Sequence, residues 1–186
     1  MNGISIIPTD TVYGIVGSAR DPHIVERIYE LRGRTRTKPC IVLIPDASGL
    51  GEFGIVPTQV EQKLIERYWP GPVTIAFSVA DGTFTYLHRG THSIAFRVPS
   101  RGDLRDLLRQ RGPLIAPSAN PEGREPAHTI EEARAYFGNA VTEYIDGGRL
   151  DGVPSTLVRV EHEKVHILRQ GSTIIDESVL ESKLRP

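Results

Sequence analysis

The chain contains little cysteine and no long apolar run. Cys40 is its only cysteine, which excludes a disulfide framework, and we interpret it as a buried structural thiol because it precedes the apolar run Ile41 to Ile44. No run approaches the ~20 apolar residues that span a bilayer, and no charged-then-apolar leader precedes the first expected strand. We therefore expect a reducing compartment, a cytoplasmic location and no membrane partner.

The chain also lacks a strong net charge. Its formal charge is -1, from 22 Lys and Arg against 23 Asp and Glu. A protein that wraps tRNA would be more basic, so any polyanion has to be bound locally. The hydrophobic content of 39% is sufficient for one sizeable core, and no linker, repeat or low-complexity segment divides the chain. We predict a single domain over residues 1–186.

Helical and strand patterns alternate along the chain. Asp21 and Pro22 mark the start of one helix, which Gly33 ends, and Thr129 with Glu132 forms the capping box of another. The predicted helices are 21–33, 58–68, 103–111, 129–138 and a short one that closes the chain. The predicted strands are 40–44, 73–79, 93–98, 114–116, 155–160 and 165–169. This order predicts an α/β (α+β) fold in which helices flank a twisted mixed sheet.

A row of cations lies between residues 32 and 38. Arg32, Arg34, Arg36 and Lys38 alternate with uncharged residues, and no carboxylate lies among them. If the segment is extended, alternate side chains share one side, and the four cations converge on a polyanion such as a triphosphate. A solvated run of charges is the alternative, and the spacing alone does not decide between the two.

Polar clusters follow several of the expected strands, at 8–11, 97–99, 117–120 and 154–156. Strand ends in open α/β sheets are where ligands bind. Arg97 shares one face of its strand with Ala95, so its guanidinium needs a partner, either an internal carboxylate or a substrate carboxylate. The hydroxyl and amide side chains of the other clusters have two possible roles, to bind a ligand or only to cap turns.

Several catalytic motifs are absent or lie in the wrong context. Residues 162–166 spell H-E-x-x-H, but they lie in a strand-turn-strand region, where His162 and His166 would be ~13 Å apart. Zinc bonds are ~2 Å long, so we predict no zinc site and assign no metal ligand to the protein. The chain has no Walker loop and no G-x-S-x-G elbow. A triphosphate would therefore be held by side chains, without a protein nucleophile.

Seven blocks between residues 6 and 171 resemble, in the same order, the YrdC-like threonylcarbamoyl-adenylate synthases. They are P-T-D-T-V-Y-G at 8–14, the cation row at 32–39, W-P-G-P-V-T at 69–74, A-F-R-V-P at 95–99, P-S-A-N at 117–120, S-T-L-V at 155–158 and L-R-Q-G at 168–171. The resemblance implies the short, single-domain type of this family, with a concave cationic cleft. It also implies a nucleotidyltransferase that condenses L-threonine, bicarbonate and ATP into threonylcarbamoyl-AMP and pyrophosphate, for tRNA N6-threonylcarbamoyladenosine modification.

The same resemblance implies roles for individual residues. It implies that Arg32, Arg34 and Lys38 bind the ATP phosphates and are the catalytic residues that stabilise the developing negative charge. Mg²⁺ is expected to assist. The ATP site as a whole comprises Arg32, Arg34, Lys38, Ser93, Ser118, Asn120 and Arg169. The threonine site comprises Thr11, Arg97, Ala116 and Ser155. Further implied partners are tRNA and the downstream tRNA threonylcarbamoyl-transferase complex.

Three positions depart from the family pattern. Arg32 stands where lysine is usual, Leu43 where many relatives have histidine, and residues 121–123 replace the commoner Leu-Ser-Gly. Because Arg34 and Lys38 keep their family identities, we expect Arg32→Lys to change kcat/KM little. The chain begins almost at its first strand, whereas relatives usually carry a helix before it, so a homodimer partner could cover the bare face. We also expect no counterpart of the C-terminal domain that the longer members carry.

Two other functions remain open at this point. One is a paralogue with carbamoyl-transfer or hydrolytic activity, against which the cation row and the S-x-N block argue. The other is a module that binds double-stranded RNA or tRNA on the same concave surface without catalysis. The near-neutral charge disfavours this second function.

Overall fold

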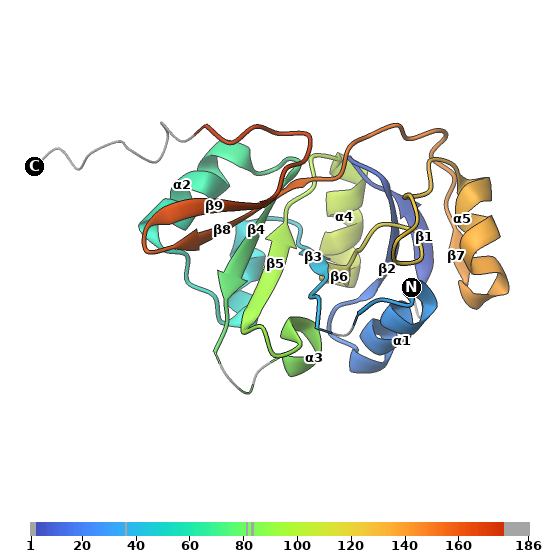
Figure 1. The fold of residues 1–186 in the computed structure, drawn as a ribbon, viewed down its shortest axis with the longest axis horizontal. Helices are drawn as coiled ribbons and strands as arrows, with labels where there is room; N and C mark the ends of the chain where they lie inside the picture. The colour runs from blue at the N-terminus through green and yellow to red at the C-terminus, as the bar shows by residue number, and fades with distance from the viewer. Residues whose placement is uncertain (1–2, 36, 81, 83, 177–186) are drawn as a thin grey trace, which may run out of the picture.

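The computed structural model describes residues 3–35, 37–80, 82 and 84–176. They form one mixed sheet with strand order β7-β1-β2-β6-β3-β5-β4-β8-β9 (Figure 1). The strands are β1 Ser5–Pro8, β2 Tyr13–Ser18, β3 Ile41–Leu43, β4 Val73–Ser78, β5 Ser93–Arg97, β6 Leu114–Ile115, β7 Glu143–Tyr144, β8 Thr156–Glu161 and β9 Lys164–Arg169. The helices are α1 Pro22–Arg32, α2 Gln59–Tyr68, α3 Thr85–His88, α4 Gly102–Arg111 and α5 Ile130–Phe137, with 3-10 turns η1 Ala47–Phe53 and η2 Gly138–Ala140. The predicted fold class is confirmed.

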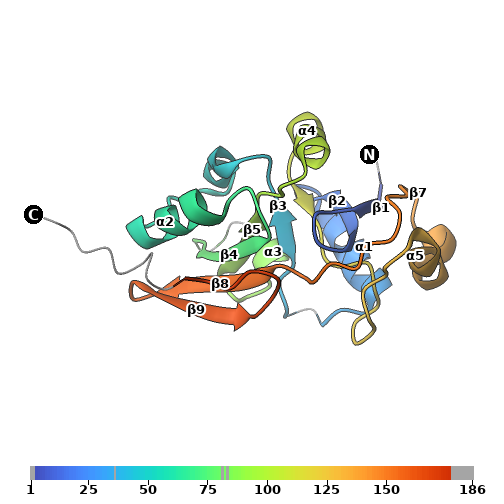
Figure 2. The ribbon, with the colours of Figure 1, turned by 90° about the horizontal axis from the view of Figure 1, so that it is seen from above.

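The sheet combines parallel and antiparallel pairs. Three pairs are parallel, β1 with β7, β3 with β5 and β4 with β8, and the remaining neighbours are antiparallel. Figure 2 shows β1, β2 and β7 at one end of the twisted sheet, β4, β8 and β9 at the other, and β3 between them. The central strands therefore bring together loops that are distant in the sequence.

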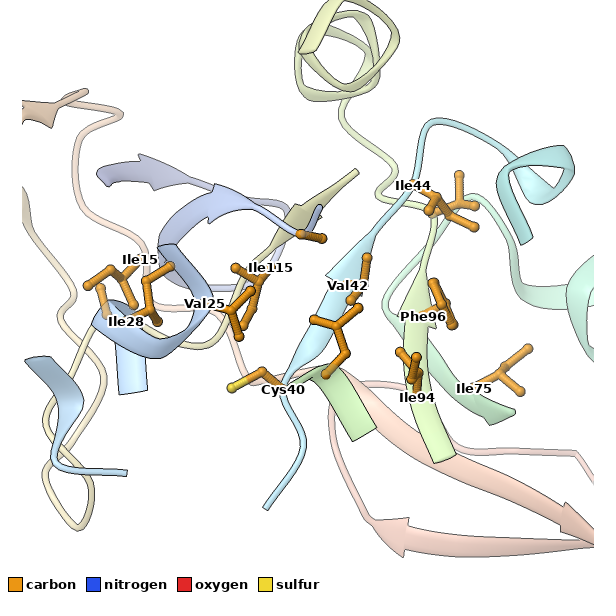
Figure 3. Packing of buried hydrophobic residues seen from close by; sticks show 14 of the residues in the cluster. Ile15, Val25, Ile28, Cys40, Val42, Ile44, Ile75, Ile94, Phe96 and Ile115 are labelled. Carbon is orange, nitrogen blue, oxygen red and sulfur yellow. The ribbon is translucent and has the colours of Figure 1, made fainter. Parts of the chain in front are cut away.

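Helix α1 forms where its capping residues predict it. The Asp21 side chain accepts hydrogen bonds from the backbone N–H groups of His23 and Ile24, and Gly33 ends the helix with a left-handed φ of 56°. Figure 3 shows Val25 and Ile28 beside Ile15 of β2, which fixes the helix on the sheet. The C-terminal residue of α1, Arg32, is held at a defined place by this packing.

Buried side chains lie on both faces of the sheet. On one face Val42, Ile75, Ile94 and Phe96 belong to the larger core cluster (Figure 3). On the other face, α4 places Leu104 and Leu108 against Val16, Leu43 and Leu114. Leu43 is therefore a core residue in this chain. Burial of such side chains contributes roughly 1.5–3 kcal/mol each.

Strand β5 shows the alternation that the sequence predicts. Ile94 and Phe96 point into the core, so Ala95 and Arg97 point to the opposite face. Arg97 lies opposite Leu43 in the parallel pair of β3 and β5, so it shares the face of the sheet against which α4 packs. The part of this face that α4 leaves uncovered carries the cleft described below.

The structure also adds elements that the sequence patterns do not predict. Strand β2, the single-turn helix α3 and the short strand β7 were not expected. Each is short or glycine-containing, so its pattern is weak, and tertiary contacts decide its conformation. The predicted closing helix lies outside the described residues. Within the described ranges, no helix has the length and apolar character required to cross a membrane.

Candidate functional site

A cleft of about 150 Å³ opens on the face of the sheet that carries Arg97. Its floor is built from small residues on neighbouring strands, Gly14, Ala76, Ala95 and Ala116. Larger side chains at these positions would fill the space. The combination of a small-residue floor and polar strand ends is typical of a ligand site in an α/β sheet.

All but two of the predicted site residues line this cleft. Those that do are Thr11, Arg32, Arg34, Ser93, Arg97, Ala116, Ser118, Ser155 and Arg169. Lys38 and Asn120 lie next to it but do not line it. The structure therefore brings together residues from α1, β5, the loop after β6, and the ends of β8 and β9. Their individual roles remain predictions.

Arg97 is buried at the C-terminal end of β5, only 4% exposed. Its Nη1 lies 3.0 Å from Oδ1 of Asp10 and donates to Oγ1 of Thr11 at 3.2 Å. Its Nε is buried and has no hydrogen-bond partner among the described residues. The internal carboxylate considered for Arg97 is therefore Asp10. Arg97 also lines the cleft, and its contact with a substrate carboxylate stays a prediction.

Hydroxyl groups surround the cleft near Arg97. Oγ1 of Thr11 and Oγ1 of Thr9 lie 3.1 Å apart, and Oγ of Ser155 lies 2.8 Å from Oγ1 of Thr74. The guanidinium of Arg169 donates to the carbonyl oxygen of Ser155 at 2.9 Å. A guanidinium with several adjacent hydroxyls suits an amino acid, whose carboxylate, amine and side chain all need polar partners.

Arg32 is also buried, and its guanidinium is held by the loop after β6. Its Nε donates to the Asn120 carbonyl at 2.8 Å, and its Nη2 donates to Oδ1 of Asn120 at 3.2 Å and to Oγ of Ser118 at 3.3 Å. Nη1 is buried without a hydrogen-bond partner in the described part of the chain. The side-chain amide of Asn120 is itself saturated, because Nδ2 donates to two carbonyl oxygens. Asn120 therefore positions Arg32.

The expected extended row of cations is wrong in its geometry. Gly33 is left-handed and the Lys38 N–H donates to the Thr35 carbonyl at 3.1 Å, so the segment turns. Arg34 stabilises this turn by donating to the carbonyls of Lys38 and Pro39. Lys38 is 60% exposed and pairs with Glu122 at 2.7 Å, and Arg36 lies outside the described residues. Local hydrogen bonding replaces the extended conformation. Of the three described cations, Arg32 and Arg34 line the cleft and Lys38 does not.

The cleft is strongly cationic. Burial, and to a lesser extent the charge of neighbouring Arg34, lowers the pKa of Arg32 to about 10. Burial also lowers the pKa of Arg97 and of Arg169. The charge of Arg169 adds to the shift at Arg97, which Asp10 opposes. Among the described lining residues there is no carboxylate. Such a set of guanidinium groups favours carboxylate and phosphate ligands.

Asp10 and Arg159 are functional candidates to which the sequence reasoning gave no role. Asp10 orients Arg97 and also accepts hydrogen bonds from the N–H and hydroxyl of Ser100. Arg159 lines the cleft from β8, on the same strand face as Leu157. Alternation within the predicted strand 155–160 was the signal that could have identified Arg159. Cys40 lines the cleft as well and is buried, as expected.

The H-E-x-x-H segment has the predicted strand-turn-strand form. His162 and Glu163 make the turn between β8 and β9, with positive φ angles of 50° and 63°, and His166 lies opposite Arg159 in β9. No group of His, Cys, Asp and Glu that could hold a metal was found among the described residues.

We expect purified protein to contain no stoichiometric zinc, and zinc chelation to leave its activity intact, because an extended segment separates the two histidines. Elemental analysis before and after chelation, with an activity assay on the same samples, tests this expectation. One zinc per chain, removed together with activity, would contradict it.

Comparison with known proteins identifies the family of this chain. The family model of the Sua5, YciO and YrdC proteins, described as telomere recombination, matches residues 1–171. The chain is 30% identical over its whole length to a Bacillus subtilis threonylcarbamoyl-AMP synthase, of which it covers 54%. It is 34% identical over 77% of its length to the Idiomarina loihiensis threonylcarbamoyl-AMP synthase, of which it covers 79%.

A solved structure is similar over most of the fold. The Pyrococcus abyssi Sua5 complexed with L-threonine matches with a TM-score of 0.84 and 29% identity, over 91% of this chain and 51% of that one. The chain thus spans about half the length of the longer relatives it matches. On the match over residues 1–171, the chain belongs to the Sua5/YciO/YrdC family.

Proposed function

We propose that this protein is a threonylcarbamoyl-AMP synthase. The observation that carries the proposal is that Arg97, surrounded by hydroxyl groups, and the group Arg32, Arg34 and Arg169 line one carboxylate-free cleft. An amino-acid carboxylate and a triphosphate would each find guanidinium partners there, close enough to react. Relatives named for this activity, and a similar fold complexed with L-threonine, support the assignment.

The proposed reaction has two steps. The amine of L-threonine combines with bicarbonate to form a carbamate and water. A carbamate oxygen then attacks the α-phosphorus of ATP, the bond to the bridging oxygen breaks, and pyrophosphate leaves. Thr11, Arg97, Ala116 and Ser155 are proposed to hold threonine. The ATP side comprises Arg32, Arg34, Lys38, Ser93, Ser118 and Arg169, with Asn120 acting through Arg32.

Catalysis in this scheme comes from alignment and charge stabilisation. At 4 Å a pair of unit charges is worth about 4 kcal/mol at an effective dielectric of 20, against about 1 kcal/mol in water. Partly buried arginines therefore stabilise the charge that develops on the phosphates better than exposed ones would. The described lining offers no carboxylate, so the phosphates themselves would hold Mg²⁺, which supplies further charge neutralisation.

The partners of this activity are part of the proposal. Threonylcarbamoyl-AMP is a mixed anhydride and would be consumed by a transferase that modifies tRNA in the cytoplasm. A single domain that comprises residues 1–186 would be sufficient for the synthase step. Direct tRNA binding and homodimerisation are separate hypotheses, which sedimentation with and without tRNA would test.

We expect pyrophosphate release to require threonine and bicarbonate together, because the carbamate must form before it attacks phosphorus. Purified protein is incubated with ATP, with each component omitted in turn, while pyrophosphate is quantified and the adenylate is identified by mass spectrometry. Equal pyrophosphate release without threonine or without bicarbonate would reject the synthase and favour a hydrolytic paralogue.

A further inference from the structure

The carboxylate of Glu122 fills an anion site built by the turn after α1. Its Oε2 accepts hydrogen bonds from the Thr35 N–H at 2.6 Å and from the Thr35 hydroxyl at 2.9 Å. Its Oε1 accepts one from Nζ of Lys38 at 2.7 Å. A backbone N–H, a hydroxyl and an ammonium that converge on one point form a donor set suited to a phosphate group.

This site adjoins the cationic cleft. Thr35 and Lys38 belong to the same turn as Arg34, which lines the cleft, and the Glu122 N–H donates to the Arg32 carbonyl at 2.7 Å. The side chains of Lys38 and Glu122 are 60% and 26% exposed, so a ligand can reach the pair. Exposed ion pairs of this kind are weak and exchange readily.

Glu122 remains an anion over the whole neutral range. Its hydrogen bonds with Lys38 and Thr35 lower its pKa to about 2. The carboxylate therefore competes with any other anion for the three donors. Protonation does not remove this competition at the pH of the cell.

We propose that Glu122 is an internal competitor for the terminal phosphate of a polyphosphate ligand, which displaces the carboxylate from Thr35 and Lys38. The ligand would be ATP or pyrophosphate, and in this respect the inference rests on the proposed function. A terminal phosphate carries more negative charge and more acceptor oxygens than a carboxylate, so it can replace Glu122. When the Glu122 carboxylate returns to Thr35 and Lys38, the affinity of the site for the pyrophosphate product falls.

The test measures binding of inorganic pyrophosphate by isothermal titration calorimetry at fixed ionic strength. Glu122→Gln removes the competing charge and is expected to tighten binding by about fivefold, the upper range for an exposed ion pair. The matched control is Glu125→Gln, on the same loop. Glu125 is exposed, and among the described residues its backbone carbonyl, not its carboxylate, accepts a hydrogen bond, from the Tyr136 hydroxyl. Binding to Glu122→Gln that is unchanged or weaker than wild type overturns the proposal.

A double-mutant cycle separates competition from a purely structural role of Glu122. If Glu122 competes for Lys38, Lys38→Ala costs more pyrophosphate affinity in the Glu122→Gln background than in wild type. If Glu122 only holds the turn in place, Glu122→Gln weakens binding and Lys38→Ala adds nothing to it. That second pattern would refute the competition.

Two further measurements keep the result unambiguous. If Glu122→Gln does not fold, Glu122→Asp withdraws the carboxylate by one methylene, and unchanged pyrophosphate affinity in that variant counts against the proposal. Pyrophosphate binding is measured without threonine or bicarbonate. Failure of the synthase assay with tighter binding in Glu122→Gln would therefore reject the proposed function alone.

Discussion

Arg97→Ala is expected to lower kcat/KM for L-threonine by roughly 30-fold to several thousandfold, with little change in the Kd for ATP. Arg97 is 4% exposed, and its Nη1 donates a hydrogen bond to Oγ1 of Thr11. Loss of a charge-assisted hydrogen bond to a desolvated partner costs about 2–5 kcal/mol, and about 1.4 kcal/mol corresponds to a factor of ten. Steady-state kinetics with threonine varied, together with a separate ATP titration, measures both effects.

The same substitution leaves Asp10 buried without its cation. Breaking a buried ion pair in this way destabilises a protein by about 3–5 kcal/mol, so the melting temperature of Arg97→Ala should also fall. The variant Asp10→Asn with Arg97→Ala removes both charges. Its melting temperature should recover, whereas its defect in threonine use should persist.

Arg101→Ala is the matched control for Arg97→Ala. Arg101 follows the same strand but pairs with the exposed Asp103, and its loss should leave threonine kinetics unchanged. Unchanged threonine KM and kcat in a folded Arg97→Ala variant would remove Arg97 from the site and leave its pair with Asp10 as a structural feature.

The local part of the fold could be predicted because it depends on short-range chemistry. Helix α1 begins after its cap Asp21, at Pro22, and ends before Gly33, close to the limits that the sequence predicts. The alternation in 93–98 correctly places Arg97 on the face opposite to Ile94 and Phe96. Helix capping, the backbone conformation of glycine and side-chain alternation depend on residues that are close in the sequence, so they can be predicted from it.

The candidate site could be predicted only as a set of residues. The ordered family blocks identify residues that the fold does bring into one cleft, including Thr11, Ser118 and Arg169. The contacts between them depend on the order of strands in the sheet, which no local pattern specifies. The pair of Asp10 with Arg97, for example, requires the loop after β1 to lie beside the end of β5.

The prediction of an extended cation row is wrong for a different physical reason. Alternating charges are compatible with a strand, but they also occur in turns, and hydrogen bonds to carbonyl oxygens decide between the two. Here Arg34 and the Lys38 N–H satisfy carbonyls within the turn, and Glu122 fixes Lys38 from another loop. Spacing alone contains no information about these competing partners.

The contacts of Arg32 change the result expected for its substitution by lysine. From charge alone, Arg32→Lys should change kcat/KM little. The structure shows that Nε and Nη2 of Arg32 together donate to three acceptors on Asn120 and Ser118. One ammonium cannot reproduce this planar arrangement, and each buried acceptor left unsatisfied costs about 1–3 kcal/mol. We now expect Arg32→Lys to lose at least tenfold in kcat/KM for ATP, approaching Arg32→Ala.

A pH profile distinguishes loss of geometry from loss of charge in Arg32→Lys. Burial lowers the pKa of Arg32 from its ordinary value to about 10, and the charge of Arg34 acts in the same direction. The same burial would lower the pKa of the ammonium in Arg32→Lys, whose ordinary value is already below that of a guanidinium. ATP affinity of Arg32→Lys should therefore begin to fall at a lower pH than that of the wild type, because the ammonium loses its proton first. Wild-type affinity should hold up to about pH 10.

Two outcomes for Arg32 would contradict this account. If Arg32→Lys keeps wild-type kcat/KM at pH 7, the contacts with Asn120 and Ser118 contribute nothing beyond charge. If Arg32→Ala leaves ATP affinity and turnover unchanged, Arg32 serves only to join α1 to the loop after β6. The second outcome is the harder to reconcile with the structure. Arg32 is buried, its Nη1 has no hydrogen-bond partner among the described residues, and an anionic ligand would stabilise this charge.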